Sequence, residues 1–261
     1  LQRALVARGA RGEVVACDDP AVAWPRYDRL ALKSCWNYHL CAPAFLAWLD
    51  RLDVLRVPLV NATDVVRANL SKRYLKTLAD AGVPVVPSAF LTEVPPAAPS
   101  AVPASWTRLV AKPAVSASAF RTLAFERARW AEHGEALGAI ARHSELLVQP
   151  YLDAVETRGE RSLVYISGAF THAVEKRPAR GDFRVQGELG GRSRLCRPGA
   201  ATVALGRAAL DALAPHAPYA RVDVLPHDSG WCVGEVELID PQLFFALAPR
   251  ALDALAEALL S

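Results

Sequence analysis

The sequence predicts a mixed fold, in which an α/β part is followed by an α+β part. Three observations lead to this prediction. Short apolar strands and amphipathic helices alternate over roughly the first 66 residues, which favours a small parallel sheet. Beyond residue 109, short strands follow one another across tight turns, a pattern that favours antiparallel pairing. Between the two parts, residues 94–103 hold four prolines without a regular period, which indicates an exposed loop.

The first part begins with a helix-like segment, residues 1–10, which we expect to end at Gly12. A helix is also predicted from Pro43, because proline suits a first helical turn and apolar residues then recur at helical spacing through Leu52. Short apolar runs predict strands at 13–17, 29–33 and 57–61.

The middle of the chain holds a long predicted helix over residues 64–81, with Asp64 as its N-cap and Gly82 as its end. A second helix is predicted over 128–142. Strands are predicted on either side of that helix, at 109–112 and 145–149.

In the last part of the chain, from residue 162 onward, the sequence predicts strands and two helices. Ser167-Gly168 separates two strand-like runs and predicts a tight hairpin. The expected strands are 162–167, 169–175, 220–225 and 231–239, and the expected helices are 203–213 and 251–260.

The overall charge is nearly balanced, with 30 Lys and Arg against 27 Asp and Glu and a net charge of +3. This balance disfavours a strongly basic nucleic-acid binder. No uninterrupted apolar run is long enough to cross a bilayer, so we expect neither a nucleic-acid nor a membrane partner and a cytoplasmic location. The five cysteines are odd in number and fit no zinc spacing, so separate thiols are expected.

Charge is segregated along the sequence. Nine basic residues and four acids lie between Arg158 and Arg197, whereas five acids and no Lys or Arg lie between Asp223 and Asp240. A basic strip beside an acidic strip suits a polyphosphate with a divalent metal, because Lys and Arg bind the anion and carboxylates hold Mg²⁺. A solvated strand face is the other interpretation of the alternating Glu235–Leu238 run.

Common nucleotide and hydrolase motifs are absent from the sequence, including the phosphate-binding G-x-x-x-x-G-K-[ST] and G-x-S-x-G. Seven other motifs occur in a defined order. They are Asn69–Leu75, Ala81–Pro87, Val110–Pro113, Val148–Leu152, Gly181–Gln186 with Gly190-Gly191, Arg221–Asp223 and Glu235–Glu237.

This order of motifs resembles that of the ATP-grasp ligases, in particular their RimK and glutathione-synthetase-like branch. The chain is especially similar to the ATP-grasp ligase of cycloserine biosynthesis and its relatives, which carry a Trp-x-Tyr-His pattern, here Trp36-Asn37-Tyr38-His39. The resemblance covers about residues 30–260. It implies an ATP-grasp fold with three parts: a small parallel α/β domain (1–66), a lid subdomain (67–150) and an antiparallel α+β subdomain with the metal site (151–261).

The resemblance also implies roles for individual residues. Lys72 and Lys112 would contact the ATP phosphates, and the 148–152 hinge would bind adenine. Two Mg²⁺ ions would be bound by Asp223, Glu235 and Glu237, although many ATP-grasp enzymes have Asn at the third position and Asp240 competes for that role. The remaining implied residues are Gln149, Tyr151 and Leu152 at the hinge, Asp153 or Glu156 at the ribose, Glu160 near the nucleotide, and Lys176, Arg177 and Arg184 at the γ-phosphate and acyl phosphate.

A substrate-side role is a hypothesis for Trp36, Tyr38 and His39, with packing in the core as an equal alternative. The implied activity is ATP- and Mg²⁺-dependent ligation of a carboxylate to an amine through an acyl phosphate. Its substrate would be small and amino-acid-like, and ring closure within one molecule is one form of the reaction. A non-catalytic ATP-binding regulatory module is the alternative function, and a homo-oligomer remains open.

The start of the chain differs from the family pattern, because the sequence begins in a helix where these proteins usually have a strand. The sequence also contains no Met. We therefore expect that the N-terminal strand is missing from this sequence, with missing internal residues as a further alternative.

Overall fold

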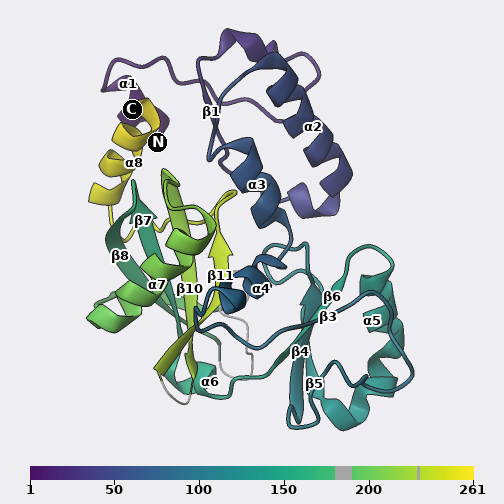
Figure 1. Cartoon of the computed structure of the whole chain (residues 1–261). Coiled ribbons are helices and arrows are strands. Elements are labelled where there is room, and N and C mark those ends of the chain that lie inside the picture. Colours follow the sequence, from purple (N-terminus) through teal and green to yellow (C-terminus); the bar gives the residue numbers. More distant parts are fainter. Residues whose placement is uncertain (180–189, 228–229) are drawn as a thin grey trace.

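Three separate β-sheets organise the chain in the computed structural model, which describes residues 1–179, 190–227 and 230–261 (Figure 1). Near the N-terminus, two strands form a parallel pair. A four-stranded sheet follows, with the order β3-β6-β4-β5, and then a five-stranded sheet with the order β11-β10-β7-β8-β9. The last two sheets are antiparallel. The predicted combination of a parallel N-terminal part with antiparallel later parts is therefore confirmed.

The N-terminal part is built around a parallel pair, in which Leu30 of one strand lies opposite Leu59 of the other. Its core contains Trp24, Leu49 and Leu52. The elements are α1 (Gln2–Val6), η1 (Trp24–Arg26), β1 (Leu30–Ala31), η2 (Tyr38–Leu40), α2 (Ala42–Leu55) and β2 (Leu59–Val60).

Two expectations for this part are corrected. The first helix ends at Val6 rather than near Gly12, because Gly9 adopts a φ of +84°, a left-handed conformation that does not continue a helix. Residues 13–17 form no strand. A strand requires a neighbouring backbone for its hydrogen bonds, and in this part of the structure β1 and β2 pair only with each other.

The helix predicted over 64–81 is two helices, α3 (Thr63–Leu70) and α4 (Tyr74–Asp80). Ser71 is extended, and the backbone N–H of Lys72 donates to the carbonyl of Ala114, 2.9 Å away. The break therefore places Lys72 against the neighbouring sheet instead of on a helix surface.

The four-stranded sheet lies within residues 67–150, where the resemblance implies a lid subdomain, and it is called the lid sheet below. Its core contains Leu109, Ala111 and Trp130. Strands β3 and β5 were not predicted, and the helix predicted over 128–142 is divided at Gly134. The elements are β3 (Ala89–Leu91), β4 (Arg108–Pro113), β5 (Leu123–Glu126), η3 (Arg127–His133), α5 (Gly134–Ala141) and β6 (Leu146–Pro150).

The five-stranded sheet forms the C-terminal subdomain, with α7 along one face and α8 beside α1 (Figure 1). Ser167 and Gly168 have φ values of +49° and +75°, as the predicted tight hairpin requires. Strand β9 was not predicted. The elements are α6 (Ala154–Arg158), β7 (Glu160–Ile166), β8 (Ala169–Arg177), β9 (Arg192–Cys196), α7 (Ala200–Leu213), β10 (Tyr219–His227), β11 (Gly230–Glu237) and α8 (Arg250–Leu260).

Helix α4 packs with this last sheet, because Tyr74, Leu75 and Leu78 share a hydrophobic core with strands β7, β10 and β11. The lid sheet itself begins only at β3. The division at residue 67 remains a prediction, but the segment just after it contributes to the C-terminal core.

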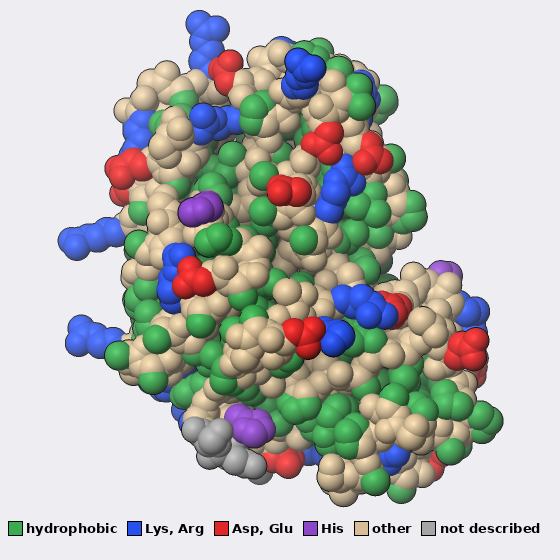
Figure 2. Space-filling view, in the orientation of Figure 1, with side chains coloured by type: hydrophobic (Ala, Val, Ile, Leu, Met, Phe, Trp, Pro, Cys, Tyr) green, Lys and Arg blue, Asp and Glu red, His purple; other side chains and the backbone are tan. Residues whose placement is uncertain are grey.

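The surface charges, the cysteines and the helix lengths can be compared with what the composition predicted. The face in Figure 2 shows basic and acidic side chains interspersed rather than gathered by sign. All five cysteines are free thiols. Among the residues that the structure describes, no helix has the length and apolar character needed to cross a membrane.

The close packing of α7 on β7 gives a stability prediction. A Cβ at Gly206 would overlap the hydroxyl of Tyr165 and lie 2.8 Å from Cδ1 of Leu163. We expect Gly206→Ala to destabilise the protein by about 1–3 kcal/mol, because extra atoms in a dense core force neighbouring groups to move. Urea unfolding followed by circular dichroism measures the change.

The control for this prediction is Gly138→Ala in α5, where the nearest atom to a new Cβ, Nη1 of Arg142, is 3.6 Å away. Replacing this half-buried helical glycine with alanine should leave the stability of the protein unchanged or raise it. Equal stability of the two variants would contradict the packing argument.

Candidate functional site

A cavity lies where the lid sheet faces the C-terminal sheet, and all three parts of the chain line it. The lid contributes residues on one side and the five-stranded sheet on the other, while Trp36 and Tyr38 come from the N-terminal part. Its charged lining residues are Lys72, Lys112, Glu160, Lys176, Arg221, Asp223, Glu235, Glu237 and Asp240.

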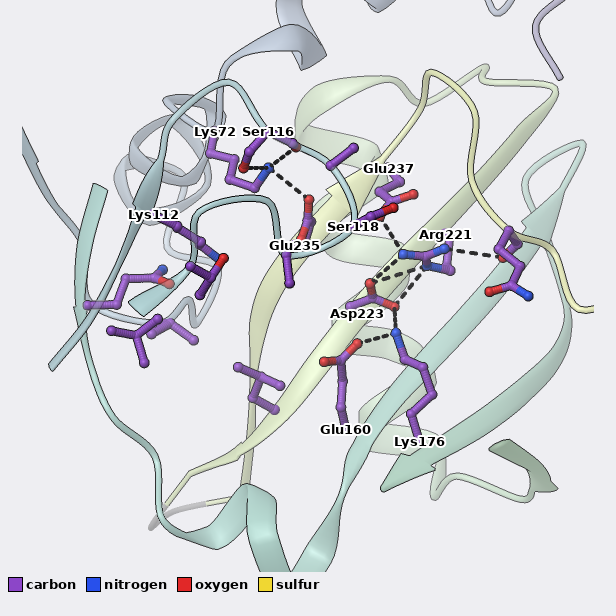
Figure 3. Close-up of a pocket in the computed structure, with 18 of the residues that line it drawn as sticks. Lys72, Lys112, Ser116, Ser118, Glu160, Lys176, Arg221, Asp223, Glu235 and Glu237 are labelled. Atoms are coloured by element: carbon purple, nitrogen blue, oxygen red, sulfur yellow. Dashed lines mark hydrogen bonds and ion pairs between the residues drawn. The ribbon is translucent and has the colours of Figure 1, made fainter. Parts of the chain in front are cut away.

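Three carboxylates converge on the C-terminal wall (Figure 3). Asp223 on β10 pairs in register with Glu235 on β11, and Glu237 lies two residues further on the same face of that strand. One carboxylate oxygen from each residue lies within 4.8 Å of the others. Such an all-oxygen group is the donor set that Mg²⁺ prefers.

Two cations neutralise the central carboxylate. Arg221 donates to Asp223 through Nη2 at 2.9 Å and also pairs with Glu237, while Nζ of Lys176 lies 3.5 Å from Asp223. Burial acts to raise the pKa of Asp223, but Arg221 and Lys176 outweigh burial and hold that pKa below its ordinary value. Asp223 therefore stays ionised inside the protein.

Glu237 and Glu160 behave differently. Burial raises the pKa of Glu237 to about 7, and the opposing effect of Arg221 does not cancel this rise. Burial also raises the pKa of Glu160, although Glu160 pairs with Lys176. The two carboxyls are thus more readily protonated than Asp223, and a bound cation would favour their ionised forms.

Two lysines line the cavity from the lid side. Nζ of Lys72 lies 3.1 Å from Oε1 of Glu235 and donates to the carbonyl of Ser116 at 2.7 Å. Lys112 alternates with the buried residues Leu109 and Ala111 along β4, so its side chain enters the cavity. Within the described ranges, Lys112 has no ion-pair partner closer than 4.0 Å.

The environment of Lys112 makes it a candidate for binding an anion. Burial lowers the pKa of Lys112, the charge of Glu235 acts in the opposite direction, and Lys72 lowers the pKa further. An incoming anion would offset the cost of holding this charge away from water.

The hinge predicted at residues 148–152 borders the same cavity. Gln149, Tyr151 and Leu152 line it, and Nε2 of Gln149 donates to Oγ of Ser88 at 2.9 Å. Glu160 lines it as well. These positions are compatible with the predicted roles near the nucleotide, which stay predictions.

Asp153 and Glu156, the two candidates for the ribose, are not among the residues that line the cavity. Both form ion pairs with Arg108, at 3.1 and 3.5 Å, and the Arg108 guanidinium lies over the Tyr151 ring. Their predicted role at the ribose stays a prediction.

The predicted phosphate-side residues are placed in different ways. Lys176 faces the cavity, whereas Arg177, the next residue on β8, points to the other side of the strand and pairs with Glu175 at 2.7 Å. Arg184 lies outside the described residues. Of the two residues that the structure describes, Lys176 and Arg177, it therefore brings Lys176 to the carboxylates and not Arg177.

Of the three residues with a hypothetical substrate-side role, Trp36 and Tyr38 line the cavity, while His39 does not. The ring of His39 packs against Phe120 of the lid, with 5.0 Å between the ring centres. Asp240 lies outside the group of three carboxylates, because its oxygens accept hydrogen bonds from Lys33 and from the backbone of Cys35.

Two features of the site had no role in the sequence-based interpretation. Arg221 lies at the centre of the ion pairs, although only Asp223 of the Arg221–Asp223 motif was assigned a function. Arg221 lies two residues before Asp223 on a predicted strand, which places both side chains on one face, and this spacing could have indicated that Arg221 belongs to the site. Residues 116–119 line the cavity from the lid loop after β4, and no pattern in the sequence indicated their position.

Comparison with known proteins agrees with this geometry. Residues 1–61 match the model of the D-cycloserine synthetase DcsG N-terminal domain. The chain is 28% identical over 177 residues to the cycloserine biosynthesis protein DcsG of Streptomyces lavendulae, an alignment that covers 64% of this chain and 58% of DcsG. Sequence similarity thus spans somewhat more than half the length of that relative.

Solved structures extend the likeness to nearly the whole chain. The crystal structure of D-cycloserine synthetase DcsG superposes with a TM-score of 0.89 and 25% identity, covering 99% of this chain and 91% of DcsG. The ATP-grasp ligase PsnB, solved with a precursor variant, Mg and ADP, gives a TM-score of 0.64 at 16% identity, with 99% and 92% covered. These matches confirm the predicted fold and the resemblance to ATP-grasp ligases.

The carboxylate cluster gives a prediction about metal binding. We expect Mg²⁺ with ADP to raise the melting temperature of the protein, because a ligand that binds the folded state stabilises it. Glu235→Gln should lose most of this increase, since it removes one of three converging carboxylates. Differential scanning fluorimetry with and without Mg²⁺ and ADP measures the effect.

Glu145→Gln is the matched control, because Glu145 pairs with Arg73 outside the cavity. This variant should keep the full increase. An unchanged increase in Glu235→Gln would show that the cluster does not hold the metal.

Proposed function

We propose that this chain, which has the ATP-grasp fold, is an ATP- and Mg²⁺-dependent ligase that joins a carboxylate to an amine through an acyl phosphate. One observation carries the proposal: the half-buried Lys112 faces the cluster of Asp223, Glu235 and Glu237 across a single cavity. A site with buried cations on one wall and metal-type carboxylates on the other matches a magnesium-bound polyphosphate.

The charges of the cavity support phosphoryl transfer. Lys72, Lys112, Lys176 and Arg221 line it, and together they offer four positive charges to phosphate oxygens. Mg²⁺ bound by the three carboxylates would supply further charge neutralisation at the phosphates. Lysine binds a terminal phosphate as a point charge, whereas arginine can hold two oxygens at once.

The proposed reaction has two steps. The substrate carboxylate attacks the γ-phosphorus of ATP, the bond to the bridging oxygen breaks, and ADP leaves. The amine then attacks the carbonyl of the acyl phosphate, loses a proton and displaces inorganic phosphate. No nucleophilic side chain is needed, because the protein acts by positioning the reactants and stabilising charge.

We infer a small, amino-acid-like substrate. The cycloserine-related names of the DcsG relatives support this class, and ring closure within one molecule is the finer form of the proposal. Trp36 and Tyr38 would form the substrate-side wall, since both line the cavity from the N-terminal part.

A regulatory module that binds ATP without catalysis is the alternative. A binding module has little use for three converging carboxylates, whose mutual repulsion must be offset by neighbouring cations. This cost favours catalysis over simple binding.

A screen for ADP release tests the proposal. The protein is incubated with ATP and Mg²⁺ and with single amino acids, pairs of amino acids and O-substituted serines. We expect ADP and phosphate in equal amounts with at least one substrate. AMP and pyrophosphate would refute the acyl-phosphate route, and ATP binding without turnover across the whole screen would favour the regulatory module.

Lys112 provides a sharper prediction. Lys112→Met should lower ATP turnover roughly 100-fold, because it removes a half-buried cation that lines the cavity on the side of the proposed phosphates. Steady-state ADP release measures the loss. Lys76→Met is the matched control, since Lys76 is exposed and pairs with Asp80 outside the cavity; comparable losses in both variants would contradict the assignment.

A further inference from the structure

The carboxylate of Asp240 is almost completely enclosed, with 2% of the side chain exposed, and both of its oxygens are engaged. Oδ1 accepts a hydrogen bond from Nζ of Lys33 at 2.8 Å. Oδ2 accepts one from the backbone N–H of Cys35 at 2.6 Å. Asp240 thus connects the end of β11 to two residues of the N-terminal part.

Lys33 is held from three directions. Besides Asp240, its ammonium donates to the carbonyl of Pro241 at 3.2 Å and lies 5.2 Å from the centre of the Tyr219 ring. A cation fixed by a carboxylate, a carbonyl and an aromatic face has little freedom to turn toward solvent.

Between the two partners of Asp240 lies Ser34, whose φ is +62°. This left-handed conformation is unfavourable for a residue with a side chain and persists where the surroundings fix the backbone. Hydrogen bonds on both sides of Ser34 provide such a restraint.

The residues that follow form the end wall of the cavity. Trp36, with about half of its surface exposed, and Tyr38 both line it. At the far end of this segment the His39 ring rests on Phe120 of the lid. The wall residues therefore stand between an anchor at Asp240 and a contact with the lid.

We propose that Asp240 is a positioning residue that fixes the substrate-side segment, residues 33–40, relative to the carboxylate cluster, and that Asp240 is not a metal ligand. The proposal rests on the proposed function, because it assigns this segment to the substrate side of that site. Asp240 follows Glu237 by three residues, so the chain links the anchor directly to the cluster.

Metal binding by Asp240 would produce a different structure. A third metal ligand should converge with Asp223 and Glu235, as Glu237 does. Asp240 instead directs both oxygens toward Lys33 and Cys35, and a metal bond would have to replace one of these hydrogen bonds.

Two substitutions test the anchor from opposite sides, with Asp211→Asn as the control because Asp211 forms an exposed pair with Arg207. Asp240→Asn and Lys33→Met should both increase amide hydrogen exchange in residues 34–40, measured by mass spectrometry on the ligand-free protein. Both should leave the Mg²⁺ concentration for half-maximal ADP binding within about twofold of the parent value, because neither residue is assigned to the metal.

Kinetics provide a second measurement with any substrate that the ADP-release screen identifies. Each variant should raise the KM for that substrate roughly tenfold while the KM for ATP stays nearly constant, because only the substrate-side wall is loosened. A loss of activity in which the KM for the substrate does not rise relative to the KM for ATP would contradict a positioning role.

The outcomes separate the anchor from the function on which it rests. A weaker Mg²⁺ response in Asp240→Asn, with no change in Lys33→Met, would make Asp240 a metal ligand and overturn the proposal. Unchanged exchange in Lys33→Met would overturn it even where Asp240→Asn fails to fold. A parent protein without turnover would refute the ligase activity, whereas the exchange data would still decide whether the anchor exists.

Discussion

The cavity depends on balancing opposite charges that are buried together. Arg221 and Asp223 share one face of β10, and Glu237 lies across from Arg221 in the antiparallel register with β11. Each of these groups alone would be costly away from water, and pairing offsets that cost only when the geometry holds several contacts at once. The register of two strands therefore determines where charge can be kept inside this protein, and the lid, hinge and N-terminal segment are arranged around that place.

The surrounding parts reach the charges both through breaks in regular structure and through a regular strand. Lys72 meets Glu235 because the chain leaves α3 before α4 begins, and its backbone then bonds to the lid at Ala114. Lys112 arrives by the simple alternation of β4. Trp36 and Tyr38 are brought to the opposite end by the segment that Asp240 holds. Irregular backbone thus carries Lys72, Trp36 and the 116–119 loop to the place where the three parts meet, whereas a regular strand carries Lys112.

The sequence predicted the strands and helices with strong periodicity and the carboxylates on β10 and β11, because strand alternation places Glu235 and Glu237 on one face. It did not predict β3, β5 or β9, short strands whose pairing depends on distant neighbours rather than on their own pattern. The sequence also did not show that Lys176 faces the cavity while Arg177 points away from it. Neighbouring residues on a strand lie on opposite faces, but tertiary packing decides which face borders the cavity. Asp240 was a candidate metal ligand by its position in the sequence, and only the fold shows that Lys33 and Cys35 occupy its oxygens.

The pairs in the cavity also explain how the same residues can serve a ligand. Glu235 is paired with Lys72, and Asp223 and Glu237 with Arg221, so these three carboxylates and two of the cations satisfy one another, whereas Lys112 forms no such pair within the described residues. On the proposed function, Mg²⁺ would take over the neutralisation of the carboxylates, and the cations would become free to face phosphate and the developing acyl phosphate. The pairs then act as internal substitutes for the ligand's charges, which keeps the side chains close to their working positions and limits the reorganisation that binding requires.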